Sequence, residues 1–192
     1  MRPMEFAKRT AANKAIDYFM EDPVPRIESM MTKIDKMLPD ALFPSQRKAF
    51  AKAIEERNNW YQLLCRIAEL DPEVATGMLK CFLTEANLIA WDKQEKSREK
   101  YQCNVPWAVL LDPTSACNLH CTGCWAAEYG HKLNLSYEDI DSIINQGNEL
   151  GTHVFIYTGG EPLVRKADLI KLCDAHPDSA FLCFTNATLI DQ

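Results

Sequence analysis

Apolar residues recur every three to four positions through the first hundred residues, which is the spacing of one face of an α-helix. Residues 5–20 show the pattern first, with Phe6, Ala12, Ile16 and Phe19 on one side. Helices are predicted over residues 5–20, 27–38, 45–54, 60–70 and 72–91, and the charged stretch 92–100 reads as a helix end or a linker. We therefore expect an all-helical N-terminal extension over residues 1–102.

The hydrophobic pattern changes after Val105. Residues 107–111, 153–157 and 180–184 are short apolar runs, typical of buried parallel strands. A capping-box-like Ser136 begins a helix that ends before Gly151, and a second helix is predicted over 164–175. This βαβαβ order predicts an α/β fold with a parallel sheet over residues 103–192, with ligands beyond the carboxyl ends of the strands.

Three cysteines follow the first of these strands, at Cys117, Cys121 and Cys124. Three thiols this close cannot all pair as disulfides, but they can converge on one inorganic centre. The spacing C-x3-C-x2-C resembles that of ferredoxin-type iron–sulfur ligands, although no fourth cysteine lies nearby. A cubane cluster held by three cysteines has one iron open to a non-protein ligand.

Composition and charge narrow the class of protein. The sequence has 47% hydrophobic and 25% charged residues, with no apolar run of membrane-spanning length and no signal-peptide core, so we predict a cytoplasmic protein with no membrane partner. Eight cysteines in such a reducing compartment favour metal or cluster binding over disulfides. Residues 101–192 carry 4 basic and 11 acidic side chains, which argues against a nucleic-acid partner.

A second motif, Thr158-Gly-Gly-Glu-Pro162, follows the second predicted strand. Together with the cysteines it resembles the radical S-adenosylmethionine (radical SAM) superfamily, in its maturase-like branch. The resemblance implies that residues 103–192 form the N-terminal half of a partial (β/α)6 TIM-like barrel, with its first three strands.

The resemblance also implies the cofactors, a [4Fe–4S] cluster and S-adenosylmethionine. Cys117, Cys121 and Cys124 would ligate the cluster, and the turn Gly159-Gly160-Glu161 would hold the amino group of S-adenosylmethionine. An electron from the cluster would cleave this cofactor to a 5′-deoxyadenosyl radical, which abstracts hydrogen from a substrate. An external electron donor such as flavodoxin or ferredoxin is the expected partner.

The sequence departs from the common family pattern at two places. Gly123 stands where many members have an aromatic residue over the adenine, and Trp125 follows the third cysteine instead. We interpret Trp125 as a cofactor-binding residue or as a tryptophan of the core or substrate pocket. Asn186 either contacts the cofactor or caps its turn, and Ala187 replaces the usual glycine there.

Two other classes of protein remain open. One is a cluster-bearing electron-transfer or binding protein without its own turnover. The other is a zinc-knuckle protein with His120 or His131 as fourth ligand, although this gives no reason for the Gly-Gly-Glu-Pro turn. The four cysteines at 65, 81, 173 and 183 are expected to be small hydrophobic residues of the core.

The substrate is not identified by the sequence. The stretch Cys117-Asn-Leu-His-Cys-Thr-Gly-Cys-Trp-Ala126 is similar to that of peptide-modifying maturases, so a peptide or protein is the candidate class. Because the resembled barrel has about six βα units, we expect an incomplete enzyme with an apolar edge at its third strand. Such a chain is expected to associate when it is expressed alone.

Overall fold

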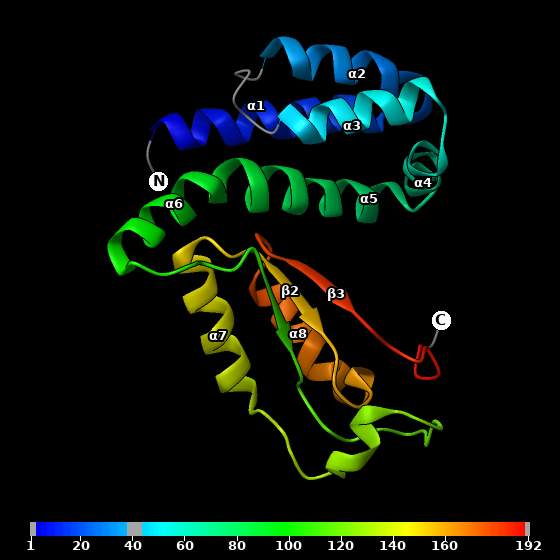
Figure 1. The fold of residues 1–192 in the computed structure, drawn as a ribbon, viewed down its shortest axis with the longest axis vertical. Helices are drawn as coiled ribbons and strands as arrows, with labels where there is room; N and C mark the ends of the chain where they lie inside the picture. Colours follow the sequence, from blue (N-terminus) through cyan, green and yellow to red (C-terminus); the bar gives the residue numbers. More distant parts are fainter. Residues whose placement is uncertain (1–2, 38–43, 191–192) are drawn as a thin grey trace. The chain divides into compact units, whose positions relative to one another are not determined.

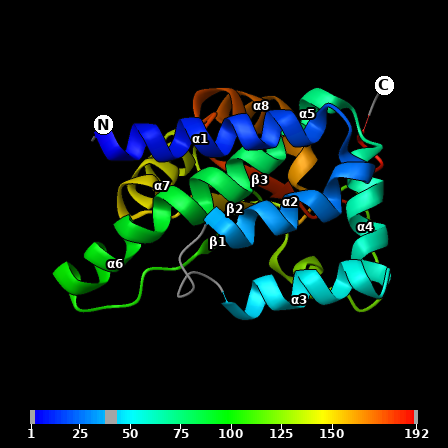
Figure 2. The same cartoon turned by 90° about the horizontal axis from the view of Figure 1, so that it is seen from above.

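The computed structural model describes residues 3–37 and 44–190, so the expected end of the second helix at Leu38 lies outside the described residues. The chain divides into two compact units, residues 1–80 and 81–192. Figures 1 and 2 show the elements of both units. None of the helices in the described ranges is both long enough and apolar enough to span a membrane.

The first unit is entirely helical. Its helices are α1 (Pro3–Met20), α2 (Pro23–Met37), α3 (Pro44–Glu55), α4 (Asn59–Ala68) and α5 (Pro72–Leu79). Phe19, Ile27 and Ile54 form its buried core. Of the apolar residues predicted on one side of α1, Ile16 and Phe19 are buried, whereas Phe6 is 55% exposed.

Side-chain caps define where two of these helices begin. The Asn58 side chain accepts a hydrogen bond from the Trp60 N–H at the start of α4. Asp71 accepts from the N–H groups of Glu73 and Val74 at the start of α5, and Pro72 occupies the first turn. These short polar residues satisfy donors that have no partner within a helix.

The helical path continues as a π-helix, η1 (Lys80–Ile89), and then as α6 (Ala90–Tyr101). The charged stretch 92–100 is therefore helix rather than linker. In the second unit, Ala86 of η1 packs against Val154 and Ala180 of the sheet. Gln94 of α6 donates a hydrogen bond to the Gly151 carbonyl at 2.7 Å, so α6 is also joined to this unit.

The sheet has three parallel strands in the order β1 (Ala108–Leu111), β2 (Val154–Tyr157) and β3 (Ala180–Cys183). Ala108 pairs with Val154, and Val154 pairs with Ala180. The helices α7 (Tyr137–Leu150) and α8 (Lys166–Ala175) connect the strands, and a short 3-10 helix, η3 (Pro162–Arg165), precedes α8. The predicted α/β fold with a parallel sheet is confirmed.

Successive side chains of β2 point to opposite faces of the sheet, and both faces pack against other elements. Phe155 and Tyr157 form the main core with Leu111 of β1 and with four apolar residues of α7 and α8: Ile140, Ile144, Leu169 and Leu172. Phe181 of β3 stacks on the Tyr157 ring at 5.7 Å. Val154 and Ile156 pack with the cluster that includes Ala86 of η1. A strand buried on both faces has the continuous apolar sequence that predicted it.

Candidate functional site

The loop from Pro113 to Leu135, which we call the cysteine loop, leaves the carboxyl end of β1 and contains all three motif cysteines. Its two ends pair with each other. The Ser115 N–H donates to the Leu133 carbonyl at 2.8 Å, and the Leu135 N–H donates to the Pro113 carbonyl at 3.2 Å. Thr114 and Asn134 form an isolated antiparallel bridge between them. The loop is therefore closed at its base.

The turn after β2 is hydrogen-bonded to the start of this loop. The Gly160 N–H donates to the Thr114 carbonyl at 3.0 Å, and the Glu161 N–H donates to the Ala116 carbonyl at 2.8 Å. The approach is so close that a Cβ on Gly160 would lie 2.2 Å from the Ala116 oxygen. Gly159 has a φ of +106°, which favours glycine, and a Cβ there would lie 2.7 Å from the Thr114 oxygen.

The Glu161 carboxylate is almost fully buried, with 1% of the residue exposed. One oxygen accepts hydrogen bonds from the Leu163 N–H at 2.9 Å and the Thr185 hydroxyl at 2.7 Å. The other accepts from the Asn186 N–H at 2.8 Å. Three donors compensate the burial of this group. Glu161 thus joins the turn after β2 to the segment after β3.

The Asn186 side chain extends this network to the cysteine loop. Its amide donates to the Asn118 side-chain oxygen at 2.9 Å, and its oxygen accepts from the Thr188 N–H at 3.0 Å. Asn118 in turn donates to the Thr188 hydroxyl at 2.7 Å. Asn186 therefore caps its own turn and contacts the residue after Cys117. Ala187 adopts a φ of +63°, a strained value for a residue with a Cβ.

The three cysteines lie on this loop at the carboxyl end of the sheet. Cys117 is half-buried, and Cys121 and Cys124 are exposed. Within residues 3–37 and 44–190, no three His, Cys, Asp or Glu side chains are arranged to hold a metal ion. The donor set nevertheless suits an iron–sulfur cluster, because it offers three soft cysteine sulfurs on one solvent-accessible loop.

Trp125 begins the short 3-10 helix η2 (Trp125–Tyr129), directly after the third cysteine. Its side chain is 60% exposed, and its ring meets the edge of the Tyr129 ring at 5.7 Å. The interpretation of Trp125 as a core tryptophan is therefore wrong. That Trp125 binds the cofactor or lines the substrate pocket stays a prediction.

The remaining motif-like groups behave as structural residues. Burial raises the pKa of the Cys173 thiol to about 11 and raises the pKa of the Cys81 and Cys183 thiols, which keeps them protonated and poor as ligands. Cys65 packs against the core of the helical unit. The His131 ring nitrogen Nδ1 lies 3.4 Å from the Cys117 N–H, which donates to it.

A cavity of about 640 Å³ opens beside the cysteine loop. Its lining comes from the loop, from η3 and α8, and from the segment after β3: Asn118, Leu163, Val164, Lys166, Thr188, Leu189 and Ile190. Its size is within the range of small-molecule sites. The sequence predicted neither this cavity nor the position of Asn118, because both depend on contacts between distant segments.

The closed cysteine loop and the glycine turn both lie at the carboxyl edge of a parallel sheet, where ligands of α/β proteins bind. Residues 111–192 match the family model of the radical SAM superfamily. We therefore assign this part of the chain to the radical SAM superfamily, whose members bind a [4Fe–4S] cluster and S-adenosylmethionine.

Several curated proteins are similar to part of the chain. A GTP 3′,8-cyclase of Geobacter sulfurreducens is 45% identical over 60 residues, which are 29% of this chain and 18% of the relative. An Fe-coproporphyrin III synthase of Methanosarcina barkeri is 33% identical over 88 residues, 44% of this chain and 22% of the relative. An uncharacterized protein of Archaeoglobus fulgidus is 29% identical over 103 residues, 52% of this chain and 24% of the relative.

The chain thus spans less than a quarter of the length of these relatives. No solved structure matches it.

Proposed function

We propose that this chain takes part in radical SAM catalysis, with Cys117, Cys121 and Cys124 as the protein ligands of a [4Fe–4S] cluster. When bound, the cluster supplies the electron that cleaves S-adenosylmethionine to a 5′-deoxyadenosyl radical, which abstracts hydrogen from the substrate. We further propose that the three-stranded sheet is part of a (β/α)6 partial barrel and that an external protein such as flavodoxin or ferredoxin donates the electron.

One observation carries this proposal. The Gly-Gly-Glu turn is hydrogen-bonded onto the first residues of the cysteine loop, through Gly160 to Thr114 and Glu161 to Ala116. These contacts hold the turn against the loop at the carboxyl end of the sheet, where ligands of α/β folds bind. A zinc knuckle or an electron-transfer cluster needs no such turn beside it.

The same turn is our candidate for the amino end of S-adenosylmethionine. We propose that Gly159, Gly160 and Glu161 line this position. A carboxylate has about four acceptor positions, and three on Glu161 are filled by the chain itself, so one remains for an ammonium donor. We propose that Asn186 and Trp125 lie along the rest of the cofactor, since Asn186 contacts the cysteine loop and Trp125 is exposed on it.

The substrate class is a separate proposal. The named relatives act on different molecules, as their names GTP 3′,8-cyclase and Fe-coproporphyrin III synthase state, and so they do not select one substrate. We propose a peptide or protein, because the cysteine stretch resembles that of peptide-modifying maturases.

Anaerobic reconstitution with iron and sulfide tests the cluster ligands. The wild-type chain should bind about four irons and four sulfides, the content of a cubane cluster. Replacing Cys117, Cys121 and Cys124 together by alanine should abolish this binding. The matched control is Cys103→Ala, since Cys103 is also exposed but lies outside the motif.

Each alternative function gives its own result in the same experiment. Tight zinc binding without acid-labile sulfide would contradict the proposal and support the zinc knuckle. A cluster that forms, but whose reduced protein never converts S-adenosylmethionine to 5′-deoxyadenosine, would support the electron-transfer alternative.

A further inference from the structure

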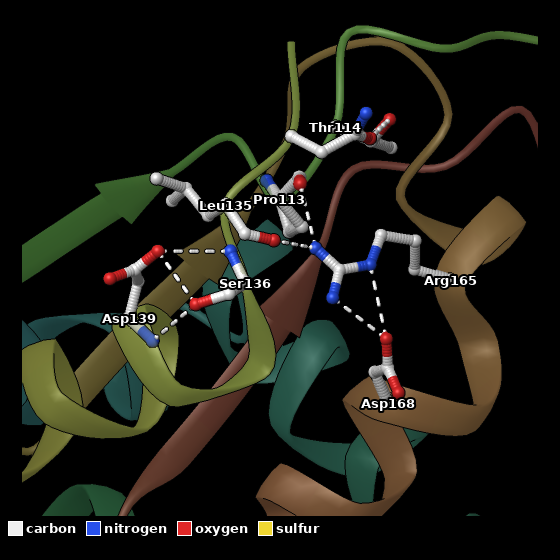
Figure 3. A network of polar contacts seen from close by, with 8 residues as sticks. Pro113, Thr114, Leu135, Ser136, Asp139, Arg165 and Asp168 are labelled. Carbon is white, nitrogen blue, oxygen red and sulfur yellow. Dashed lines mark hydrogen bonds and ion pairs between the residues drawn. The ribbon is translucent and has the colours of Figure 1, made fainter. Parts of the chain in front are cut away.

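Arg165, the last residue of η3, binds three separate segments of the second unit through one guanidinium group (Figure 3). Its Nη1 donates to the Pro113 carbonyl at 3.0 Å and also to the Leu135 carbonyl. Its Nε and Nη2 donate to one Asp168 carboxylate oxygen at 3.1 and 2.7 Å. Only 16% of the Arg165 side chain is exposed, so these bonds are largely shielded from water.

Two of these acceptors are the two ends of the cysteine loop. The Pro113 carbonyl also accepts the Leu135 N–H, so it receives hydrogen bonds from both the returning chain and the guanidinium. The base of the loop is therefore fastened by a charged side chain in addition to its own backbone pairing. Every residue from Thr114 to Asn134, including the three cysteines, lies between these two points.

Arg165 also stands close in the chain to the glycine turn. It follows Glu161 by one turn of 3-10 helix, η3, and it precedes α8. Asp168 in the first turn of α8 fixes the direction of the guanidinium plane. The guanidinium contacts thereby join the loop base to the segment that follows the turn at Gly159–Glu161, in addition to the backbone bonds of the turn itself.

The Leu135 contact has a further consequence for α7. Ser136 follows directly and is the N-cap of this helix, with its hydroxyl accepting the Asp139 N–H at 3.0 Å. The Ser136 N–H donates to the Asp139 carboxylate at 3.1 Å, which completes a capping box (Figure 3). The loop thus returns into a helix whose first turn is also fixed.

We propose that Arg165 is a positioning residue for the cluster site, which holds the ends of the cysteine loop in place against the Gly159–Glu161 turn. It does so without contacting the cluster or the cofactor. Only the effect of Arg165 on the cluster site rests on the proposed function, because its contacts with Pro113, Leu135 and Asp168 are made within the chain without any cofactor. A lysine cannot replace Arg165, since a single ammonium cannot address two carbonyls and a carboxylate in one plane.

Hydrogen exchange of the metal-free protein tests the clamp directly. In Arg165→Lys and Arg165→Met, the backbone amides of Ser115, Leu133 and Leu135 should exchange roughly 10- to 100-fold faster, as expected for the loss of charge-assisted hydrogen bonds. The amides of β2 should keep their wild-type exchange rates. Unchanged exchange at the loop base in a folded Arg165→Lys variant would overturn the proposal.

Arg98→Lys provides a matched control within the same unit. Arg98 also binds a carboxylate three residues away, on Glu95, and a backbone carbonyl, on Val105, but it lies on α6. Its replacement should leave exchange at the loop base unchanged. If it accelerates that exchange as much as Arg165→Lys does, the effect is general destabilisation and the clamp is rejected.

A second measurement separates this inference from the proposed function. After reconstitution, Arg165→Lys should bind iron as the wild type does, because its cysteines are intact. Its reduced cluster should need about 10-fold more S-adenosylmethionine to change its paramagnetic spectrum. A wild-type chain without a cluster contradicts the proposed function alone, whereas equal cofactor dependence in wild type and Arg165→Lys contradicts the role of Arg165.

Asp168→Asn is a further variant for the same test. If circular dichroism shows that Arg165→Met does not fold, hydrogen exchange is compared in Arg165→Lys and Asp168→Asn instead. Asp168→Asn removes the charge that orients the guanidinium and should accelerate exchange at the same three amides by a smaller factor. Wild-type exchange at these amides in folded Arg165→Lys overturns the proposal, whatever Asp168→Asn shows.

Discussion

Gly160 lies where the turn after β2 meets the start of the cysteine loop. In Gly160→Ala, the added Cβ would lie 2.2 Å from the Ala116 carbonyl oxygen, a backbone atom that no rotamer change can move. We expect a loss of about 1–3 kcal/mol in the unfolding free energy of the second unit, as for other overpacked sites. Urea unfolding followed by hydrogen exchange of β2 amides measures this loss.

Gly77→Ala is the control for this substitution. Gly77 lies in α5, and a Cβ there would meet no atom within 4 Å. Alanine should therefore stabilise the helical unit by up to about 1 kcal/mol through its higher helix propensity. A Gly160→Ala variant as stable as wild type would show that the turn and the loop do not approach so closely.

The glycine turn shows which features of the site could be predicted from the sequence and which could not. The resemblance implied that Gly159 and Gly160 hold the amino group of S-adenosylmethionine, and no sequence signal placed them against the chain's own backbone. The structure shows that the chain's own residues Thr114 and Ala116 lie against them. Likewise, two of the three donors on Glu161, the Thr185 hydroxyl and the Asn186 N–H, come from the segment after β3, and local sequence carries no signal for them.

At the scale of elements, His153 joins the start of β2 to the residues before β3. Its Nδ1 donates to the Asp178 carbonyl at 3.1 Å, and its own carbonyl accepts the Ala180 N–H at 2.8 Å. Burial lowers the pKa of the imidazole below its usual value; the hydrogen bond to the Asp178 carbonyl opposes this decrease, and the charge of Lys93 adds to it. The folded protein therefore prefers the neutral ring.

This preference predicts a pH dependence. Below an unfolded pKa of about 6.5 the unfolded chain binds more protons at this site than the folded chain, so stability is present above that pH and falls as the pH decreases. The thermal midpoint should decrease from pH 7.5 to 5.5, and His153→Asn should make this decrease smaller. Identical slopes in the two proteins would contradict the assignment.

Elements with strong local patterns were predicted well, and elements defined by distant contacts were not. The three strands and the cap at Ser136 are confirmed, with strand ends differing by one residue. The π-helix η1, the 3-10 helix at Trp125–Tyr129 and the paired base of the cysteine loop were missed. Each depends on packing or on hydrogen bonds between segments that periodicity does not report.

At the scale of the whole molecule, the division into two units predicts separable stability. Phe19 is 7% exposed and packs with Ile27 and Ile54 in the helical unit. Phe19→Ala should cost this unit about 3–5 kcal/mol, as for other large core residues. Hydrogen exchange should be faster in α1–α4 and unchanged in β2. Equal acceleration in β2 would show that the whole chain unfolds as one cooperative unit.

We propose that the three cysteines hold a cluster with one iron open to S-adenosylmethionine beside the glycine turn. The most direct test is the electron-paramagnetic spectrum of the reduced, reconstituted wild-type chain, recorded with and without the cofactor. We expect S-adenosylmethionine to shift the spectrum and adenosine, which lacks the amino and carboxylate groups of the methionine part, to leave it unchanged. A spectrum unchanged at saturating S-adenosylmethionine would contradict the account.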